Sequence, residues 1–471
     1  MSTSETPTIK RPLPIFRFDG QRRYSMDEPT TRTRPTAARI FSAGCCRCND
    51  AAYRCSSSIT PATLLGTTAL VAASLLGEPA LAADPIQLKL EGYLQSFITA
   101  GHIDRDVVGT TGISYHPVTF RYESEIWFTG STRLDNGTTV GVRIELEAWS
   151  QNTGVSGASP TGAIDQLDEE YIFATGDWGR IEFGGIDAVS YKMQISSQSA
   201  LIGWGFHDPT PANRGIGYTA ANNGGRFGTN VGLSASLAVN SGDANKLSYR
   251  TPVIAGFQLG FSYAPAYSPT AGTARCAFRG GGANFPNCPR NDNTWKNAID
   301  VAGTYDNTFG GVRVRLFGSY ATARFDRGTL TPDGAAGTAS NAARRWKSWA
   351  GGAQISYAGF TLGGGLGRDN NGLRGDNATR WYTASLLYER GPWQVSLGWW
   401  GGRNNDGTAT VAGAQNAPGK DKHDVFEVGI NYLLSRGIKL NGGLNYVKGS
   451  GQSKSEKADA WAIIFGTALT F

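Results

Sequence analysis

The sequence predicts an all-β fold, a single transmembrane antiparallel β-barrel of 16 strands. From Ile86 onward, segments of about ten residues alternate between apolar and polar side chains, which is the period of a β-strand. Short turns and longer polar connections follow these segments in alternation, as in a series of hairpins. The 63 glycines, the 11% of aromatic residues and the mean hydropathy of -0.28 also argue against a bundle of apolar spanning helices.

The alternation is clearest in the last segment, where one face is strongly apolar. A water-soluble β-sandwich gives the same pattern, so the polar face has to distinguish the two folds. Charged pairs such as Arg313 with Arg315, and Glu145 with Glu147, occupy that face and favour lipid outside and water inside. The apolar face of the last segment holds Trp461, Ile463, Phe465, Leu469 and Phe471.

The number of strands follows from the turns. Seven short turn signals lie between alternating runs and define seven hairpins, which supply fourteen strands. The opening run from Ile86 and the closing run to Phe471 bring the count to sixteen, with both ends on the side of the short turns. The third long connection, at about 186–244, could hide a further strand at 231–239. The turn signals are at 134–137, 176–179, 251–256, 306–310, 357–360, 389–392 and 434–437.

The N-terminal part is predicted to be removed from the mature protein. Residues 47–82 have the features of a signal peptide, because the apolar run at 64–76 is too short to span a membrane and the tripeptide at 80–82 has the form of a cleavage site. The barrel then comprises residues 83–471. Residues 1–46 form an N-terminal extension without periodicity. They are either an unusually long start of the signal or the product of a start codon assigned too early, and we favour the second.

The six cysteines divide between these two parts. Four lie within residues 1–82 and are expected to have no role in the mature protein. The other two, Cys276 and Cys288, lie in one Gly/Pro-rich connection. In an exported protein such a pair predicts a disulfide across that loop.

Charge and histidine content exclude several functions. Residues 1–82 hold 10 of the 44 basic and 6 of the 38 acidic residues, so the net charge of +6 falls close to neutral in the mature part. No basic stripe predicts binding of nucleic acid. The four histidines lack the spacing of paired metal ligands, and His423 beside Asp424 fits a solvated rim better than a hydrolase. We therefore expect no enzymatic activity, metal or cofactor.

Three segments resemble the general porins of Gram-negative bacteria. They are EEYIFATGDWGRIEFGG at 169–185, KLSYRTPVIAGFQLGFSYAP at 246–265, and the terminal ALTF that ends at Phe471. The likeness covers about 86–471. It implies a homotrimeric, 16-stranded diffusion channel in the outer membrane, in contact with outer-membrane lipid and lipopolysaccharide. It also implies that the outer-membrane insertion machinery reads Phe471 as an assembly signal.

The resemblance further implies that the long third loop, at about 186–244, folds into the lumen and narrows it. In porins such a loop carries carboxylates that face basic residues on the wall, which here would be Asp187 and Asp208. This loop departs from the pattern, because it has few acids and many Gly and Asn residues. Alternation assigns to the lumen the wall candidates Arg121, Arg143, Arg250, Arg313 and Arg315.

Two channel functions fit these features. Passive diffusion of small hydrophilic solutes and ions through a water-filled pore is favoured, and a substrate-selective channel with a binding site at the constriction is the alternative. A structural or adhesive β-protein without a conducting lumen is a third class. The near-neutral charge of the mature part predicts no preference for anions or cations.

Overall fold

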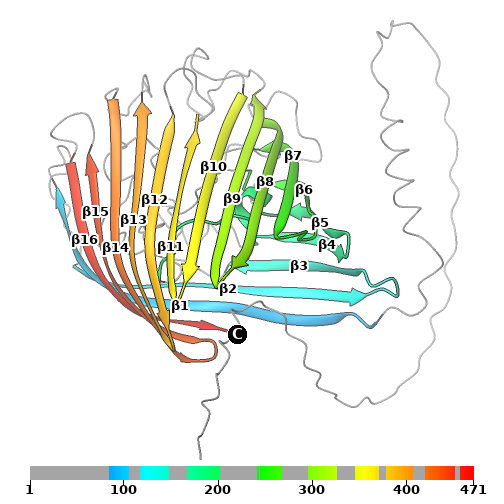
Figure 1. The fold of residues 1–471 in the computed structure, drawn as a ribbon, viewed down its shortest axis with the longest axis horizontal. Coiled ribbons are helices and arrows are strands. Elements are labelled where there is room, and N and C mark those ends of the chain that lie inside the picture. The colour runs from blue at the N-terminus through cyan, green and yellow to red at the C-terminus, as the bar shows by residue number, and fades with distance from the viewer. Residues whose placement is uncertain are drawn as a thin grey trace, which may run out of the picture. The chain divides into compact units, whose positions relative to one another are not determined.

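The described part of the chain forms one closed β-barrel (Figure 1). In this computed structural model each strand pairs with its neighbours in sequence, and β1 pairs with β16. The prediction of an antiparallel barrel of 16 strands is therefore confirmed. The predicted signal peptide, Asp208, Cys276, Cys288 and the candidate strand at 231–239 lie outside the described residues. The described residues are 84–105, 117–147, 167–201, 241–242, 244–267, 295–325, 345–370, 378–406, 419–450 and 457–471.

The strands differ strongly in length around the ring. β3 to β6 have 6 to 9 residues each, whereas the other strands have 10 to 19. One short helix, α2, follows β5. The bounds are β1 Gln87–Arg105, β2 Val118–Arg133, β3 Thr139–Glu147, β4 Glu170–Gly176, β5 Gly179–Gly185, α2 Val189–Lys192, β6 Asn245–Arg250, β7 Phe257–Tyr267, β8 Trp295–Phe309, β9 Val312–Phe325, β10 Arg345–Tyr357, β11 Phe360–Asp369, β12 Thr379–Arg390, β13 Trp393–Asp406, β14 Gly419–Ser435, β15 Ile438–Ser450 and β16 Lys457–Thr470.

Six of the seven short turns lie where the sequence predicts them. The fourth, predicted at 306–310, lies at 310–311, because β8 continues to Phe309. Glycines in the left-handed region make several of these turns possible, for example Gly137 at φ 82° and Gly359 at φ 86°. The strands extend further toward the long connections than the predicted segments of about ten residues. For example, β1 continues to Arg105 and β2 starts at Val118. Pairing over this length gives hydrogen-bond partners to backbone groups that lipid could not satisfy.

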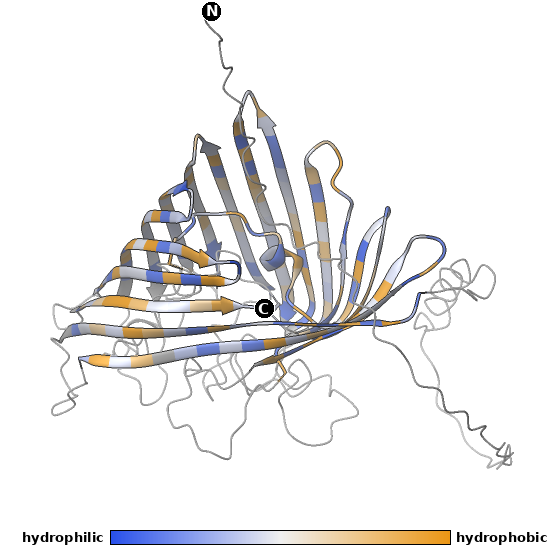
Figure 2. Ribbon diagram, turned by 90° about the horizontal axis from the view of Figure 1, so that it is seen from below, coloured by the Kyte–Doolittle hydropathy of each residue, from blue (hydrophilic) through white to orange (hydrophobic). Residues whose placement is uncertain are grey.

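The two faces of each strand meet different surroundings. On β12 the outward side chains Tyr382 and Leu386 are about two-fifths exposed, while the inward Thr383 and Ser385 are buried. The view into the barrel shows this alternation strand by strand, with α2 inside the ring (Figure 2). Thr383 and Ser385 are buried because residues 197 and 198, which lie inside the barrel, contact them.

Aromatic side chains form a girdle at the short-turn end of the outer wall. Cross-strand neighbours stack there in tilted pairs, with ring centroids 4.4 Å apart for Phe360 and Tyr388 and 4.6 Å apart for Trp393 and Tyr432. Amphipathic rings suit the boundary between hydrocarbon and headgroups. Among the described residues, no helix has the length and apolar character needed to cross a membrane.

The seam between β1 and β16 closes the barrel. Phe471 and Gly92 exchange two backbone hydrogen bonds of 3.0 and 3.1 Å at its short-turn end. The phenyl ring of Phe471 lies over Gly92 on the outer face, where a side chain on residue 92 would collide with it. The ring is 61% exposed, which agrees with the outward orientation inferred from its phase with Phe465 and Leu469.

Candidate functional site

The lumen holds residues 186–201, which we call the inner segment. It leaves the wall at the end of β5, forms α2 and then follows the inner wall toward β16. Hydrogen bonds or packing contacts join it to β7, β8 and to every strand from β10 to β16. The prediction that the third loop enters the lumen is confirmed for these residues, while residues 202–240 are outside the described part.

Two buried charged side chains hold both ends of the third loop against the wall. Lys246 on β6 is 1% exposed, and its Nζ donates hydrogen bonds to the carbonyl oxygens of Ile186 and Gly242. Asp300 on β8 is fully buried and accepts hydrogen bonds from Ser190 Oγ at 3.2 Å and Ser241 Oγ at 2.8 Å. The start and the end of the loop are thereby fixed to the same two strands.

Small polar side chains of the wall bind the rest of the inner segment. The backbone N–H of Gln198 donates to Ser385 Oγ at 2.7 Å, and that of Ala200 donates to Ser396 Oγ at 2.8 Å. Gly352 on β10 is needed where the segment approaches most closely, because a Cβ at this position would overlap the carbonyl oxygen of Ile195.

The short strands carry a group of ion pairs on their inner face. Glu182 on β5 is 2% exposed and accepts hydrogen bonds from Arg180 Nε at 2.6 Å and from Arg250 at 3.2 Å. On β3, Arg143 donates to the carboxylate of Glu145. A guanidinium that donates to a carboxylate forms one of the stronger hydrogen bonds in proteins, so these side chains have defined positions.

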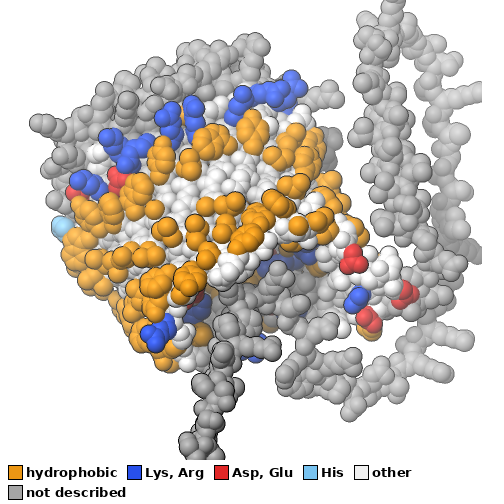
Figure 3. Space-filling view, in the orientation of Figure 1, with side chains coloured by type: hydrophobic (Ala, Val, Ile, Leu, Met, Phe, Trp, Pro, Cys, Tyr) orange, Lys and Arg blue, Asp and Glu red, His pale blue; other side chains and the backbone are white. Residues whose placement is uncertain are grey.

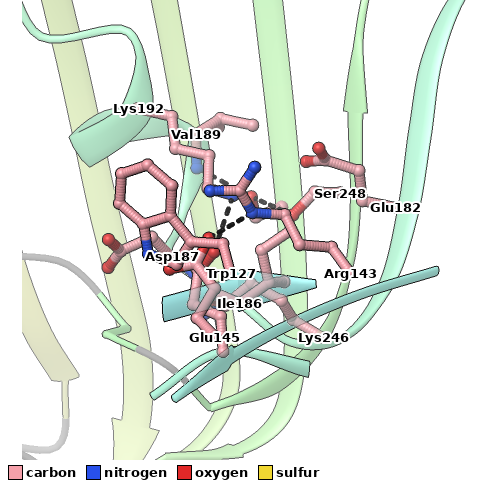
Figure 4. A network of polar contacts seen from close by, with 12 residues as sticks. Trp127, Arg143, Glu145, Glu182, Ile186, Asp187, Val189, Lys192, Lys246 and Ser248 are labelled. Atoms are coloured by element: carbon pink, nitrogen blue, oxygen red, sulfur yellow. Dashed lines mark hydrogen bonds and ion pairs between the residues drawn. The ribbon is translucent and has the colours of Figure 1, made fainter. Parts of the chain in front are cut away.

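The inner segment adds a cation to this group. Lys192 Nζ lies 3.5 Å from Glu169 Oε2 and 4.9 Å from the centre of the Tyr171 ring. The guanidinium of Arg143 lies 4.8 Å from the centre of the Trp127 ring. Figure 4 shows Trp127, Arg143, Glu145, Glu182 and Lys192 near one another. We call the set the lumen charge cluster, which consists of Arg143, Glu145, Glu169, Arg180, Glu182, Lys192 and Arg250.

A second basic pair lies on β9, three strands beyond Arg250 of β6. Arg313 forms an ion pair with Asp306 of β8, and Arg315 follows it on the inner face. Both are close to the short turn at 310–311, so they lie near the short-turn mouth. Further along the inner face of β9, Phe317 is buried in one cluster with Val189 and Met193 of the inner segment.

Several site residues predicted from the sequence come together here. Arg143 and Arg250 belong to the lumen charge cluster, and the backbone N–H of Asp187 donates to Glu169 Oε1 at 2.6 Å. Arg121 lies on β2 opposite Phe97, and its side chain is not among those described.

The cluster also holds charges that the sequence did not predict. The described part of the loop contributes a cation, Lys192, and the wall contributes the carboxylates Glu145 and Glu182. Sequence reasoning did not identify Lys192, Lys246 or Asp300 as site residues. Glu182 could have been predicted, because alternation places it on the same face of β5 as Arg180.

Three carboxylates near the cluster have oxygens within 4.8 Å of one another, those of Glu125, Glu145 and Asp168. Oxygen ligands of this type suit Ca²⁺ or Mg²⁺. Here Glu125 accepts hydrogen bonds of 2.8 Å from both Tyr93 and Trp127, and Glu145 accepts one from Arg143. These donors account for the grouping without an ion, and we assign no metal to it.

A closed antiparallel barrel with an apolar outer wall and a charged lumen defines the class of channel-forming outer-membrane barrels. The model of one family, the Gram-negative porins, matches residues 66–452. The chain belongs to this family and is an outer-membrane diffusion channel. The fold and the family are those of non-enzymatic channels.

Solved porins show the same coverage at low sequence identity. The anion-selective porin from Comamonas acidovorans is 18% identical, with a TM-score of 0.47, and the alignment covers 82% of this chain and 100% of that one. A mutant porin of Rh. blastica is 14% identical, with a TM-score of 0.43 and the same coverage. No curated protein sequence matches this chain.

Proposed function

We propose that small hydrophilic solutes and ions diffuse through the barrel past the inner segment and the lumen charge cluster. The proposal depends on the course of residues 186–201, which are hydrogen-bonded to the inner wall. Because this segment lies inside the barrel, it narrows the lumen through which solutes would pass. Charges of both signs around this space create a transverse field that acts on passing ions. The constriction is proposed to include Asp187, Asp208, Arg121, Arg143 and Arg250, with Arg313 and Arg315 near the short-turn mouth.

Single-channel recording in a planar bilayer tests this function. We expect stepwise currents that rise linearly with voltage and with salt concentration, as for a water-filled pore. Saturation of the current by one sugar or anion would favour a substrate-selective channel with a binding site at the constriction. A correctly folded barrel that gives no current would overturn the proposal in favour of a structural role.

The protein is further proposed to assemble as a homotrimer. The short strands β3 to β5 form a low section of wall, and its outer face has an apolar hollow lined by Leu88, Val142, Ile172, Phe183 and Leu247. A second copy of the chain would cover this hollow. Electrophoresis in mild detergent without heating is expected to give a trimer band, and a monomer band alone would count against the assembly.

The rest of the outer wall is proposed to contact outer-membrane lipid and lipopolysaccharide. We further propose that residues 47–82 are a signal peptide that directs export and that residues 83–471 form the mature barrel. A disulfide is proposed between Cys276 and Cys288. The proposed function involves no nucleic acid, metal, cofactor or enzymatic step. Alkylation of both thiols in the non-reduced protein, detected by mass spectrometry, would exclude the disulfide.

Phe471 is proposed to be recognised by the outer-membrane insertion machinery, in addition to pairing with Gly92 at the seam. Its exposed ring on the outer face supports recognition by another protein. Loss of its burial alone costs about 1 to 2 kcal/mol, so a deletion of Phe471 should still refold in detergent. In cells the same deletion is expected to leave the protein in the periplasm. Normal insertion of the deletion variant would leave Phe471 with the structural role only.

A further inference from the structure

The outer wall carries a row of cations close to the long connections. Arg368 on β11 pairs directly with Arg380 on β12, Arg380 with Arg403 on β13, and Arg403 with Lys422 on β14. All four follow the outward phase of their strands, which is set by Leu366, Tyr382, Leu397 and Phe426. We call these four residues the cation row. Figure 3 shows Lys and Arg side chains along this edge of the wall, beyond the band of hydrophobic side chains.

The cation row needs a counter-charge. Like charges directly opposite each other on neighbouring strands are destabilising. Among the described outward side chains of β9 to β14, Asp424 is the single carboxylate, and it is bound to Arg403 at 2.8 Å. Within the described part of the chain, no side-chain hydrogen bond or ion pair joins Arg368, Arg380 or Lys422 to another residue.

The height of the row in the membrane identifies what can supply this charge. Arg368 follows the girdle residue Phe360 by roughly 26 Å along β11, at about 3.3 Å per residue. A strand tilted by about 40° converts this length to roughly 20 Å of height, near the far edge of an apolar band about 25 Å tall. Long basic side chains extend further toward the headgroups. The row therefore lies at the level of lipid phosphates.

We propose that the cation row is a binding site for the phosphate groups of the anionic glycolipid of the outer leaflet. This inference rests on the proposed function as an outer-membrane channel, because in barrels of this class the longer connections face the cell exterior. Guanidinium groups bind phosphate oxygens in bidentate pairs, and three of the four cations are arginines. Four adjacent cations on neighbouring strands can bind both phosphates of one lipid A. Arg403 has a defined position within the row, because it donates to the carbonyl of His423 at 2.9 Å as well as to Asp424.

Lipid A binding by the purified protein in neutral detergent tests the site. The variant Arg380→Gln/Lys422→Gln removes two exposed cations and leaves the Arg403–Asp424 pair intact. We expect bisphosphorylated lipid A to bind this variant roughly 30-fold more weakly than the wild type. The control Arg390→Gln/Arg436→Gln removes two exposed cations at the short-turn end and is expected to keep the wild-type affinity. Dephosphorylated lipid A should bind all three proteins with equal, low affinity.

Two results would overturn the site: wild-type affinity of the row variant for lipid A, or an equal loss in both variants. Tight binding of dephosphorylated lipid A would show that acyl chains alone are recognised, which is also contrary to the proposal. Conductance is measured on the same preparations and is expected to be unchanged in both variants. A wild-type protein without conductance would refute the channel function, while its lipid A affinity would still decide the binding site.

Discussion

The short strands β3 to β6 and the long wall from β9 to β14 both alternate inward and outward side chains, but their inward side chains differ in kind. Inside the short strands, charged side chains such as Arg143 and Glu182 form ion pairs that face the lumen. Inside the long wall, small residues such as Ser385, Ser396 and Gly352 bind the inner segment. The inner segment thus packs closely on the long wall, whereas toward the short strands it contributes Lys192 to the lumen charge cluster. A pore is narrowed asymmetrically when one part of its wall binds an inner chain segment and another part carries the charged side chains.

The largest expected effect tests how the segment is fixed at the boundary of the two regions. Lys246→Met removes the donor to Ile186 and Gly242 and the cation that interacts with the buried Asp300. We expect a loss of about 3 kcal/mol, because removal of one buried charge leaves the other uncompensated. Urea unfolding in lipid vesicles, followed by tryptophan fluorescence, measures it. The control Lys89→Met breaks an exposed ion pair with Glu91 and is expected to cost less than about 1 kcal/mol.

A middle-sized effect tests whether the long wall is a packing surface. Gly352→Val places a side chain where the Ile195 carbonyl lies, and overpacking of this kind costs about 2 kcal/mol. The displaced segment is also expected to change single-channel conductance. Gly318→Val on the neighbouring β9 is the matched control, since no atom lies within 4 Å of its Cβ position. Equal stability and conductance of both variants would contradict the division between the two regions.

The smallest expected effect concerns the charged side alone. Glu182→Gln leaves Arg180 and Arg250 without their shared carboxylate. A unit charge acts on an ion 4 to 8 Å away in water with about 0.5 to 1 kcal/mol, so anion permeability relative to cations should rise two- to fivefold. The reversal potential in a KCl gradient measures this ratio. Glu389→Gln, which removes an exposed carboxylate on β12, should change the ratio less, and an equal change would show that the cluster does not control selectivity.

The strands, turns and inward faces could be predicted from the sequence because each depends on local spacing. The run from Val140 to Leu146 alternates in the sequence, and its side chains alternate in the structure. The course of the inner segment could not be predicted in this way. Its contacts join Ser197 to Thr383 and Ala200 to Ser396, almost 200 residues apart, through backbone groups and hydroxyls that have no period of their own. Gly352 is a further example, because a glycine inside a strand has the same sequence signature whether the strand bends or another chain segment touches it.

The inner segment also takes part in closing the barrel. Leu201 packs against Phe97 of β1 and Ile464 of β16, the two strands that meet at the seam. Pairing of strands so distant in sequence is slow, since the entropy of loop closure is lost before any contact is gained. Leu201 gives the two edges of the seam an apolar surface on which to meet. Binding of residues 186–201 to the wall and closure of the ring therefore stabilise each other.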